Sequence, residues 1–120
     1  MSTRVLIVED ELSLAEVMRE VLAEHDMDVS IARTAEEAFR LLRDVSPQLI
    51  ILDIMLPGQD GLSFLRVLRS IPALKNNPVL VVSVLTQQEH RDDAIAAGAD
   101  DFLPKPFTKD ELLSAVRSLL

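Results

Sequence analysis

The sequence predicts a single α/β domain, residues 1–120, in which a doubly wound, five-stranded parallel sheet carries helices on both faces. Short apolar runs alternate with longer segments of helical periodicity, a pattern typical of parallel sheets with right-handed crossovers. The runs 49–52 and 79–82 contain no polar residue, as expected for strands buried on both faces. With 120 residues, 48% of them hydrophobic, the chain is long enough for one core and too short for two.

The first strand is expected at residues 4–8, directly before the acidic pair Glu9 and Asp10. An amphipathic helix should follow from about residue 14, because apolar residues recur there at helical spacing. Taken alone, Asp10 fits the N-cap of this helix. A second, weaker strand is expected at residues 28–32. The apolar positions of the first helix are Leu14, Val17, Met18, Val21 and Leu22.

The second helix is expected to begin after Thr34, because Thr34 and Glu37 have the spacing of a capping box. It should end before Pro47, since the residue preceding a proline is pushed out of helical geometry. The third strand, residues 49–52, runs straight into Asp53 at its carboxyl end. The inward positions expected on the second helix are Ala35, Ala38, Phe39 and Leu42.

Residues 56–61 are expected to form a loop, because they contain one proline and two glycines. The third helix follows and ends at Pro72, and the fourth strand is expected at residues 79–84. The inward positions of the third helix are Phe64, Leu65, Leu68 and Ile71. Three acidic residues of the connecting segments are expected to be turn or solvent-exposed residues, namely Asp60, Asp100 and Asp101.

The fourth helix is expected over roughly residues 88–97, with mostly small side chains at its inward positions. Because small side chains bury little area, we expect it to be the most mobile helix. Gly98 fits the position after a helix that requires a positive φ. The inward residues expected here are Ala94, Ala96 and Ala97, around Ile95.

The fifth strand is expected at residues 101–103. Thr108 and Glu111 predict a capping box for the last helix, and Phe107 is expected to pack on Leu112 as a hydrophobic staple. The apolar positions of this helix are Leu112, Leu113, Val116, Leu119 and Leu120.

The composition argues against several functional classes. A formal net charge of −8 and a pI near 4.6 disfavour direct binding of nucleic acid, whose phosphates would be repelled. The absence of cysteine excludes disulfides and thiolate metal sites. The sequence has neither a P-loop nor a glycine-rich dinucleotide fingerprint after the first strand. No apolar run has the length of a membrane span and no secretory signal is visible, so we expect a cytoplasmic protein without a membrane partner.

Polar groups follow four of the expected strands at their carboxyl ends. They are Glu9 with Asp10, then Asp53, Ser83 and Lys105. Such ends share one edge of a parallel sheet, where α/β folds place their ligands. Three carboxylates repel one another unless they share a cation, and oxygen ligands without histidine or cysteine favour Mg²⁺. Asp53 could then attack a phosphoryl group whose charge is neutralised by the metal and Lys105, with Ser83 as a hydrogen-bond donor.

Five short segments combine into a specific pattern. They are Glu9-Asp10, the Asp-x-x-x-Pro-Gly-x-Asp-Gly stretch from Asp53 to Gly61, Ser83 after an apolar strand, Gly98-Ala-Asp-Asp101, and Lys105-Pro106-Phe107. In this order and spacing the chain resembles the receiver domain of two-component response regulators, from Val5 to Leu119. The resemblance implies a flavodoxin-like sheet with the strand order 2-1-3-4-5.

The resemblance also implies a role for each site residue. Asp53 is similar to the phosphoacceptor aspartate, and Lys105 is expected to pair with it beside a cis Lys105-Pro106 peptide bond. Ser83 would be the switch hydroxyl, and Phe102 the aromatic side chain that changes rotamer when Ser83 moves. The implied Mg²⁺ ligands are Glu9, Asp10, Asp53 and the backbone carbonyl of Met55.

The function implied is a phospho-acceptor switch, and not an enzyme with a separate substrate. A histidine kinase or phosphotransfer protein would donate the phosphoryl group in a Mg²⁺-dependent reaction. The domain would catalyse its own phosphorylation and dephosphorylation. Phosphorylation would switch the surface of the fourth helix, fifth strand and fifth helix, which would contact a downstream effector domain or protein. A homodimer formed on phosphorylation is a further partner that the resemblance implies.

Two alternative functions stay open at this point. One is a phosphorylation-independent interaction module of the same fold, against which the complete set of site residues argues. The other is a small aspartyl-phosphate phosphohydrolase, which would need a second acid two residues after Asp53, where the chain has Met55.

Val84 departs from the smaller residue usual in the family and would restrict access to the phosphoryl group. Thr86 offers a second hydroxyl, but we favour Ser83 because it closes the apolar strand.

Overall fold

The computed structural model describes residues 2–56, 59–84 and 87–120. Five strands form one parallel sheet in the order β2-β1-β3-β6-β7, which confirms the predicted fold class and strand order. Proceeding along the chain, the strands of this sheet are β1 (Thr3–Val8), β2 (Met27–Ala32), β3 (Leu49–Asp53), β6 (Val79–Ser83) and β7 (Asp101–Pro104).

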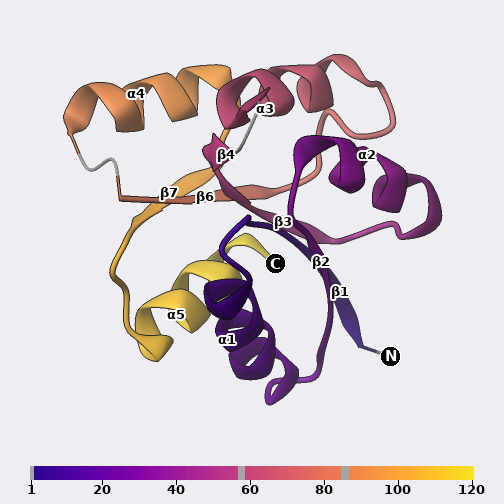
Figure 1. The fold of residues 1–120 in the computed structure, drawn as a ribbon, viewed down its shortest axis with the longest axis vertical. Helices are drawn as coiled ribbons and strands as arrows, with labels where there is room; N and C mark the ends of the chain where they lie inside the picture. The colour runs from indigo at the N-terminus through magenta and orange to yellow at the C-terminus, as the bar shows by residue number, and fades with distance from the viewer. Residues whose placement is uncertain (1, 57–58, 85–86) are drawn as a thin grey trace.

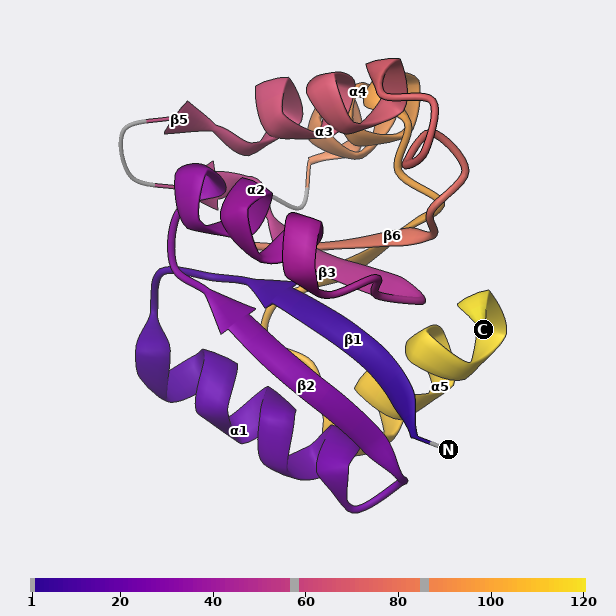
Figure 2. The same cartoon turned by 90° about the vertical axis from the view of Figure 1, so that its right-hand side faces the viewer.

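In the described part of the chain, five helices cover the two faces of the sheet. Figure 1 shows α1 and α5 on one side and α2, α3 and α4 on the other. Their bounds are α1 (Leu12–Ala23), α2 (Ala35–Asp44), α3 (Gly61–Ser70), α4 (Gln88–Ala97) and α5 (Lys109–Leu119). The view in Figure 2 shows β1 and β2 between α1 and α2. Within the described residues, no helix is long and apolar enough to cross a membrane.

The sheet divides the hydrophobic core into two layers because side chains alternate along each strand. In β1, Val5 and Ile7 belong to the layer under α1 and α5, whereas Leu6 and Val8 belong to the layer under α2, α3 and α4. The central strands therefore have no face in contact with water, which explains why their sequences lack polar residues.

The strand register brings together the carboxyl ends of β1, β3, β6 and β7, where the predicted site residues lie. Val8 pairs with Leu52, Asp53 pairs with Val82, and Ser83 pairs with Pro104. Because the four strands run in parallel, the residues that follow or close them meet at one edge of the sheet.

The predicted helix boundaries are largely confirmed. The Thr34 hydroxyl accepts a hydrogen bond from the Glu37 backbone at 3.1 Å. Thr108 and Glu111 form both hydrogen bonds of a capping box, at 3.1 and 2.9 Å. Gly98 follows α4 with a φ of 116°, as its position after the helix predicted.

Several orientations predicted from periodicity are wrong. In α1 the buried stripe is Ala15, Met18 and Leu22, which confirms Met18 and Leu22. Val17 lies outside this stripe and is 55% exposed. Ile95 is 51% exposed and Ala96 is also exposed, so α4 turns only Ala94 and Ala97 inward.

The residues at the ends of three elements also differ from the prediction. Leu120 is half-exposed, and Ile71 follows α3 as a partly buried residue outside the helix. The strand expected at residues 79–84 ends at Ser83, and Val84 is exposed.

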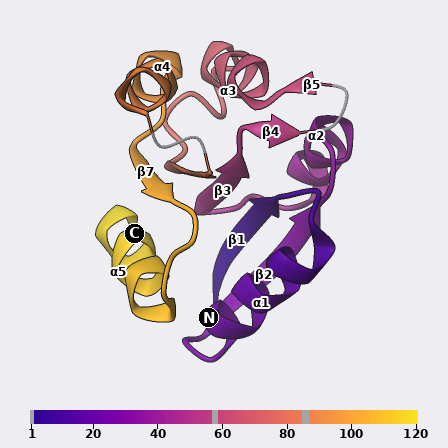
Figure 3. The ribbon, with the colours of Figure 1, turned by 60° about the vertical axis from the view of Figure 1, so that its left-hand side comes forward.

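The segment expected to be a loop contains a short antiparallel pair of strands, β4 (Met55–Leu56) and β5 (Gln59–Asp60). Figure 3 shows this pair beside α3, outside the main sheet. The Gly61 backbone N–H donates to the Ile54 carbonyl at 2.9 Å, which ties the start of α3 to the end of β3. Pro57, Gly58 and Thr86, which figure in the sequence predictions, lie outside the described residues.

Candidate functional site

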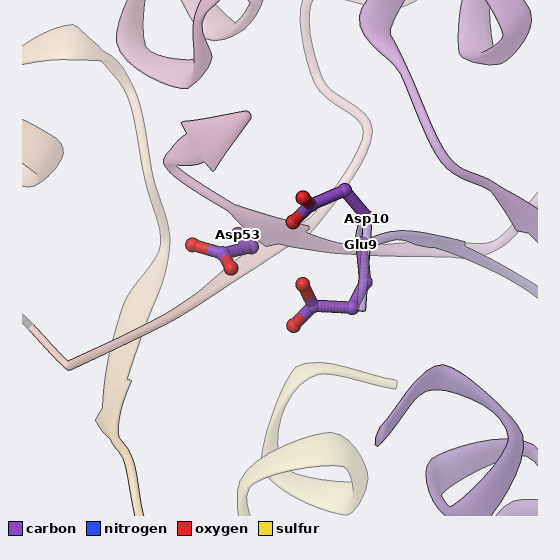
Figure 4. A group of neighbouring side chains, drawn as sticks. All are labelled: Glu9, Asp10 and Asp53. Atoms are coloured by element: carbon purple, nitrogen blue, oxygen red, sulfur yellow. The ribbon is translucent and has the colours of Figure 1, made fainter. Parts of the chain in front are cut away.

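Three carboxylates converge at the carboxyl edge of the sheet. Glu9, Asp10 and Asp53 each offer an oxygen atom within 4.8 Å of the others, and Figure 4 shows their side chains pointing into one space. Glu9 is 1% exposed and Asp53 is 5% exposed, whereas Asp10 is partly exposed. Because all three offer hard oxygen ligands, the cluster fits a small divalent cation.

Lys105 reaches into the same cluster. Its ammonium group donates hydrogen bonds to Glu9 Oε1 at 2.6 Å and to Asp53 Oδ2 at 3.0 Å. The Lys105 backbone N–H also donates to the Ser83 carbonyl at 2.8 Å, and the Lys105-Pro106 peptide bond is cis, as predicted. Lys105 is therefore the internal counter-ion of two buried carboxylates.

The cluster shifts the pKa values of two of its members. Burial raises the pKa of Glu9 and the neighbouring Asp53 raises it further, while the hydrogen bond from Lys105 opposes the shift. Burial acts to lower the pKa of Lys105, but its hydrogen bonds to Glu9 and Asp53 outweigh this effect and raise the pKa above its ordinary value. The ammonium group is thus held in its charged form, as a counter-ion requires.

The Asp53 carboxylate is oriented by the segment that follows it. Its Oδ1 atom accepts a hydrogen bond from the Met55 backbone N–H at 2.9 Å, while Oδ2 faces Lys105. Both oxygens are therefore held in position by groups from different segments. The role of the Met55 carbonyl as a metal ligand stays a prediction.

Asp10 is fixed through its backbone. The Arg33 guanidinium donates to the Asp10 carbonyl at 3.3 and 3.0 Å, a contact for which the sequence offered no signal. The N-cap of α1 is Glu11, which makes no side-chain capping bond. The interpretation of Asp10 as a simple cap is therefore wrong, and its side chain lies instead with Glu9 and Asp53.

Ser83 and Phe102 occupy neighbouring strands. Ser83 is fully buried at the end of β6, and Phe102 is 6% exposed in β7. The Arg91 guanidinium of α4 lies over the Phe102 ring, 5.3 Å from its centroid. This contact links α4 to the residue predicted to switch, and the sequence did not reveal it.

Val84 lies beside the site. It is 57% exposed and lines a hollow of about 300 Å³ together with Lys105. The other lining residues are Glu11, Leu14, Pro106 and Phe107. Val84 therefore borders the same hollow as Lys105, and its effect on access to the phosphoryl group stays a prediction.

The family model of the response regulator receiver domain matches residues 5–117. The chain belongs to this family. The receiver is 38% identical to response regulator MprA from Mycolicibacterium vanbaalenii, and equally so to MprA from Mycobacterium bovis, over all 120 residues. It spans about half the length of these relatives, 51% in each.

Solved structures show the same fold. A response regulator from Chloroflexus aurantiacus matches the receiver with a TM-score of 0.94 and 31% identity, over 99% of this chain and 98% of the other. The chemotaxis response regulator CheY4 of Vibrio cholerae matches with a TM-score of 0.94 and 27% identity, over 100% of both chains. The BeF3-activated receiver domain of RstA from Klebsiella pneumoniae matches with a TM-score of 0.89 and 28% identity, over 97% of both.

Membership of the family has coarse functional consequences. Receiver domains belong to two-component signalling, in which they interact with a histidine kinase and a downstream effector, and they are generally not classical enzymes. They bind Mg²⁺ through acidic residues, and the cluster of Glu9, Asp10 and Asp53 could hold such an ion.

Proposed function

We propose that the receiver accepts a phosphoryl group on Asp53 from a histidine kinase or phosphotransfer protein. The observation that carries this proposal is the position of the Asp53 carboxylate, 3.0 Å from Lys105 and within a cluster of three acids at the end of a buried strand. A carboxylate held in this way is oriented for attack and has a cation beside it to receive developing charge.

In the transfer step, an Asp53 oxygen forms a bond to phosphorus. The bond between phosphorus and the donor's imidazole nitrogen breaks, and the imidazole leaves with the electron pair. Lys105 would then donate to an oxygen of the phosphoryl group, and the Ser83 hydroxyl would donate to another. The same groups would serve the later hydrolysis, so the receiver would catalyse its own dephosphorylation.

Glu9, Asp10, Asp53 and the Met55 carbonyl would hold Mg²⁺, which when bound supplies positive charge to the phosphoryl oxygens. The donor set supports this assignment, because two of the three carboxylates are almost completely buried and, among the residues that the structure describes, share a single cation, Lys105. Glu9 and Asp53 would then share their charge between Lys105 and the metal.

Phosphorylation would cause a conformational change that is transmitted through Ser83 and Phe102 to α4. Movement of Ser83 would leave room for a new Phe102 rotamer, and the contact between Arg91 and Phe102 would pass the change to α4. The surface of α4, β7 and α5 would then engage a downstream effector domain or protein, or a second copy of the receiver. The greater length of the curated relatives leaves room for such an effector in the same chain.

Incubation with Mg²⁺ and acetyl phosphate, followed by intact-mass measurement, tests the proposal. The wild-type receiver is expected to gain one phosphoryl group, and Asp53→Asn is expected to gain none, because an amide is a poor nucleophile. Asp60→Asn is the matched control, since Asp60 is an exposed residue that caps α3 through a 3.0 Å bond to the Leu62 N–H. An equal adduct on wild type and Asp53→Asn would contradict the proposal, and rapid turnover of many phosphate esters would favour the phosphohydrolase.

The affinity for Mg²⁺ is expected to depend on pH through Glu9. Because the pKa of Glu9 is raised, this carboxyl group keeps its proton at a higher pH than an ordinary glutamate, and the metal must displace that proton. The dissociation constant should therefore rise as the pH falls through the raised pKa, by up to about tenfold per pH unit. Calorimetric titration at several pH values measures this, and Glu9→Gln should bind more weakly with a flatter profile. A wild-type profile as flat as that of the variant would exclude Glu9 as a ligand.

A further inference from the structure

Arg69, in the last turn of α3, binds the C-terminal end of α4. Its guanidinium donates two hydrogen bonds to the Gly98 carbonyl, at 2.9 and 2.7 Å, and a third to the Asn77 carbonyl at 2.7 Å. A weaker bond of 3.4 Å reaches the Leu74 carbonyl. Arg69 thus joins α3, the segment before β6 and the end of α4 through one planar group.

Asp100 completes this clasp, which we define as Arg69, Gly98 and Asp100. The Asp100 Oδ2 atom accepts from Arg69 at 3.0 Å and from the Val79 backbone N–H at 2.8 Å. Val79 is the first residue of β6, the strand that ends at Ser83. Asp100 is exposed and lies in a bend, which confirms the expectation, and in addition it ties the end of α4 to the sheet.

Gly98 has the geometry that lets the clasp form. A Cβ atom at this position would lie 2.7 Å from Arg69 Cγ and 2.8 Å from Arg69 Nε. The residue also has a φ of 116°, in the left-handed region that side chains disfavour. A glycine here therefore serves both the end of the helix and the close approach of Arg69.

The structure gives fewer attachments for the N-terminal end of α4, counted over the described residues. Its N-cap, Gln87, makes no side-chain capping bond, and the exposed Gln88 and Glu89 begin the helix. Both fully inward residues, Ala94 and Ala97, lie in the C-terminal half. The contact between Arg91 and Phe102 is the side-chain interaction that we find holding the N-terminal half to the sheet within the described residues.

We propose that α4 moves as a lever whose fixed point is the clasp of Arg69, Gly98 and Asp100, and whose free end carries Arg91. This inference rests on the proposed function for the source of the motion, but the asymmetry of attachment belongs to the unphosphorylated receiver. Arg69 is a positioning residue, because it binds the C-terminal end of α4, away from the phosphoacceptor. A rearrangement at Ser83 and Phe102 then displaces the free end, while the Gly98 end stays in place.

Amide hydrogen exchange tests the lever, first without any phosphodonor. In the wild type, the amides of Gly98 and Ala99, which donate to Ile95 and Ala94, should exchange more slowly than those of His90 and Arg91. In Arg69→Met, exchange at Gly98 and Ala99 should accelerate on the order of tenfold, because the charged donor to the Gly98 carbonyl, which holds this end of the helix in place, is lost. Arg66→Met is the matched control, since Arg66 is an exposed arginine of the same helix, and it should leave α4 unchanged.

The second arm adds Mg²⁺ and beryllofluoride, with binding followed by ¹⁹F resonance. In the wild type, exchange should change at residues 88–92 and not at 95–99; in Arg69→Met, the change should extend through 95–99. A merely structural role would instead raise exchange evenly and leave this boundary in place. Asp100→Asn, which keeps the bonds to Gly98, should give a smaller effect of the same kind and serves if Arg69→Met does not fold.

Three results would overturn the lever. They are equal exchange at both ends of α4 in the wild type, no effect of Arg69→Met at Gly98, and a beryllofluoride response as large at the Gly98 end as at the Arg91 end. If beryllofluoride does not bind, the proposed phosphoacceptor function fails, while the comparison in the absence of phosphodonor still decides whether Arg69 fixes one end of α4.

Discussion

Replacing Lys105 with methionine is expected to lower the free energy of unfolding of the metal-free receiver by about 3 kcal/mol at pH 7. The change removes the only ammonium group that we find against Glu9 and Asp53 in the described residues, and leaves two buried carboxylates facing each other. Urea unfolding followed by circular dichroism measures the loss, since the chain has no tryptophan or tyrosine. Lys109→Met is the control, because the 3.2 Å pair of Lys109 with Glu24 is well exposed and should contribute less than about 1 kcal/mol.

The stability of Lys105→Met should also depend on pH and on Mg²⁺ in ways that identify Lys105 as a counter-ion. Without Lys105 the pKa of Glu9 should rise further, because the hydrogen bond that opposes its shift is lost. Lowering the pH through that pKa protonates Glu9 in the folded variant. The difference in the free energy of unfolding between wild type and variant should therefore shrink as the pH falls. Added Mg²⁺ should also stabilise Lys105→Met more than wild type, because the metal replaces the missing charge. A deficit that is unchanged by both pH and Mg²⁺ would mean that Lys105 acts through packing and not as a counter-ion.

The sequence was sufficient to predict the parts of the site that depend on strand ends. An apolar run without polar alternation fits a strand buried on both faces, as in the centre of a parallel sheet, so a polar residue that closes it is expected at the carboxyl edge. This reasoning brought Glu9, Asp53 and Lys105 to one edge, where the structure places them in direct contact. Capping residues such as Thr108 were equally predictable, because a capping box is a local interaction.

The contacts made by long side chains could not be predicted in this way. Arg33 and Arg69 both donate to backbone carbonyls of segments more than twenty residues away in sequence. The sequence around an arginine is the same whether or not its side chain makes such a contact. The orientation of Ile95 was also missed, because α4 has a weak apolar stripe, and the residues that it buries are the small Ala94 and Ala97. Periodicity reports which face is apolar on average, and tertiary packing decides between adjacent positions.

Replacing Gly61 with alanine is expected to destabilise the receiver by about 3 kcal/mol, although the substitution lies in a helix. Helix propensity alone predicts the opposite sign, a gain of roughly 1 kcal/mol, so the direction of the change separates the two effects. The reason is a close backbone approach: a Cβ on Gly61 would lie 2.4 Å from Ile54 Cα and 2.8 Å from the Ile54 carbonyl oxygen. Backbone atoms cannot rotate away as the end of a side chain can, so the segment after β3 must shift.

That shift should reach the site, because Ile54 lies between Asp53 and Met55, whose N–H orients the Asp53 carboxylate at 2.9 Å. Gly61→Ala should therefore weaken Mg²⁺ binding on the order of tenfold, in addition to its effect on unfolding. Ser63→Ala, in the same helix, is the control and should change the free energy of unfolding by less than about 0.5 kcal/mol. If Gly61→Ala were as stable as wild type and bound Mg²⁺ equally well, the contact between α3 and the end of β3 would have no part in positioning the acceptor. A loss of both stability and Mg²⁺ affinity would instead explain Gly61 by the close approach of Ile54, next to Asp53, and not by the freedom of a loop.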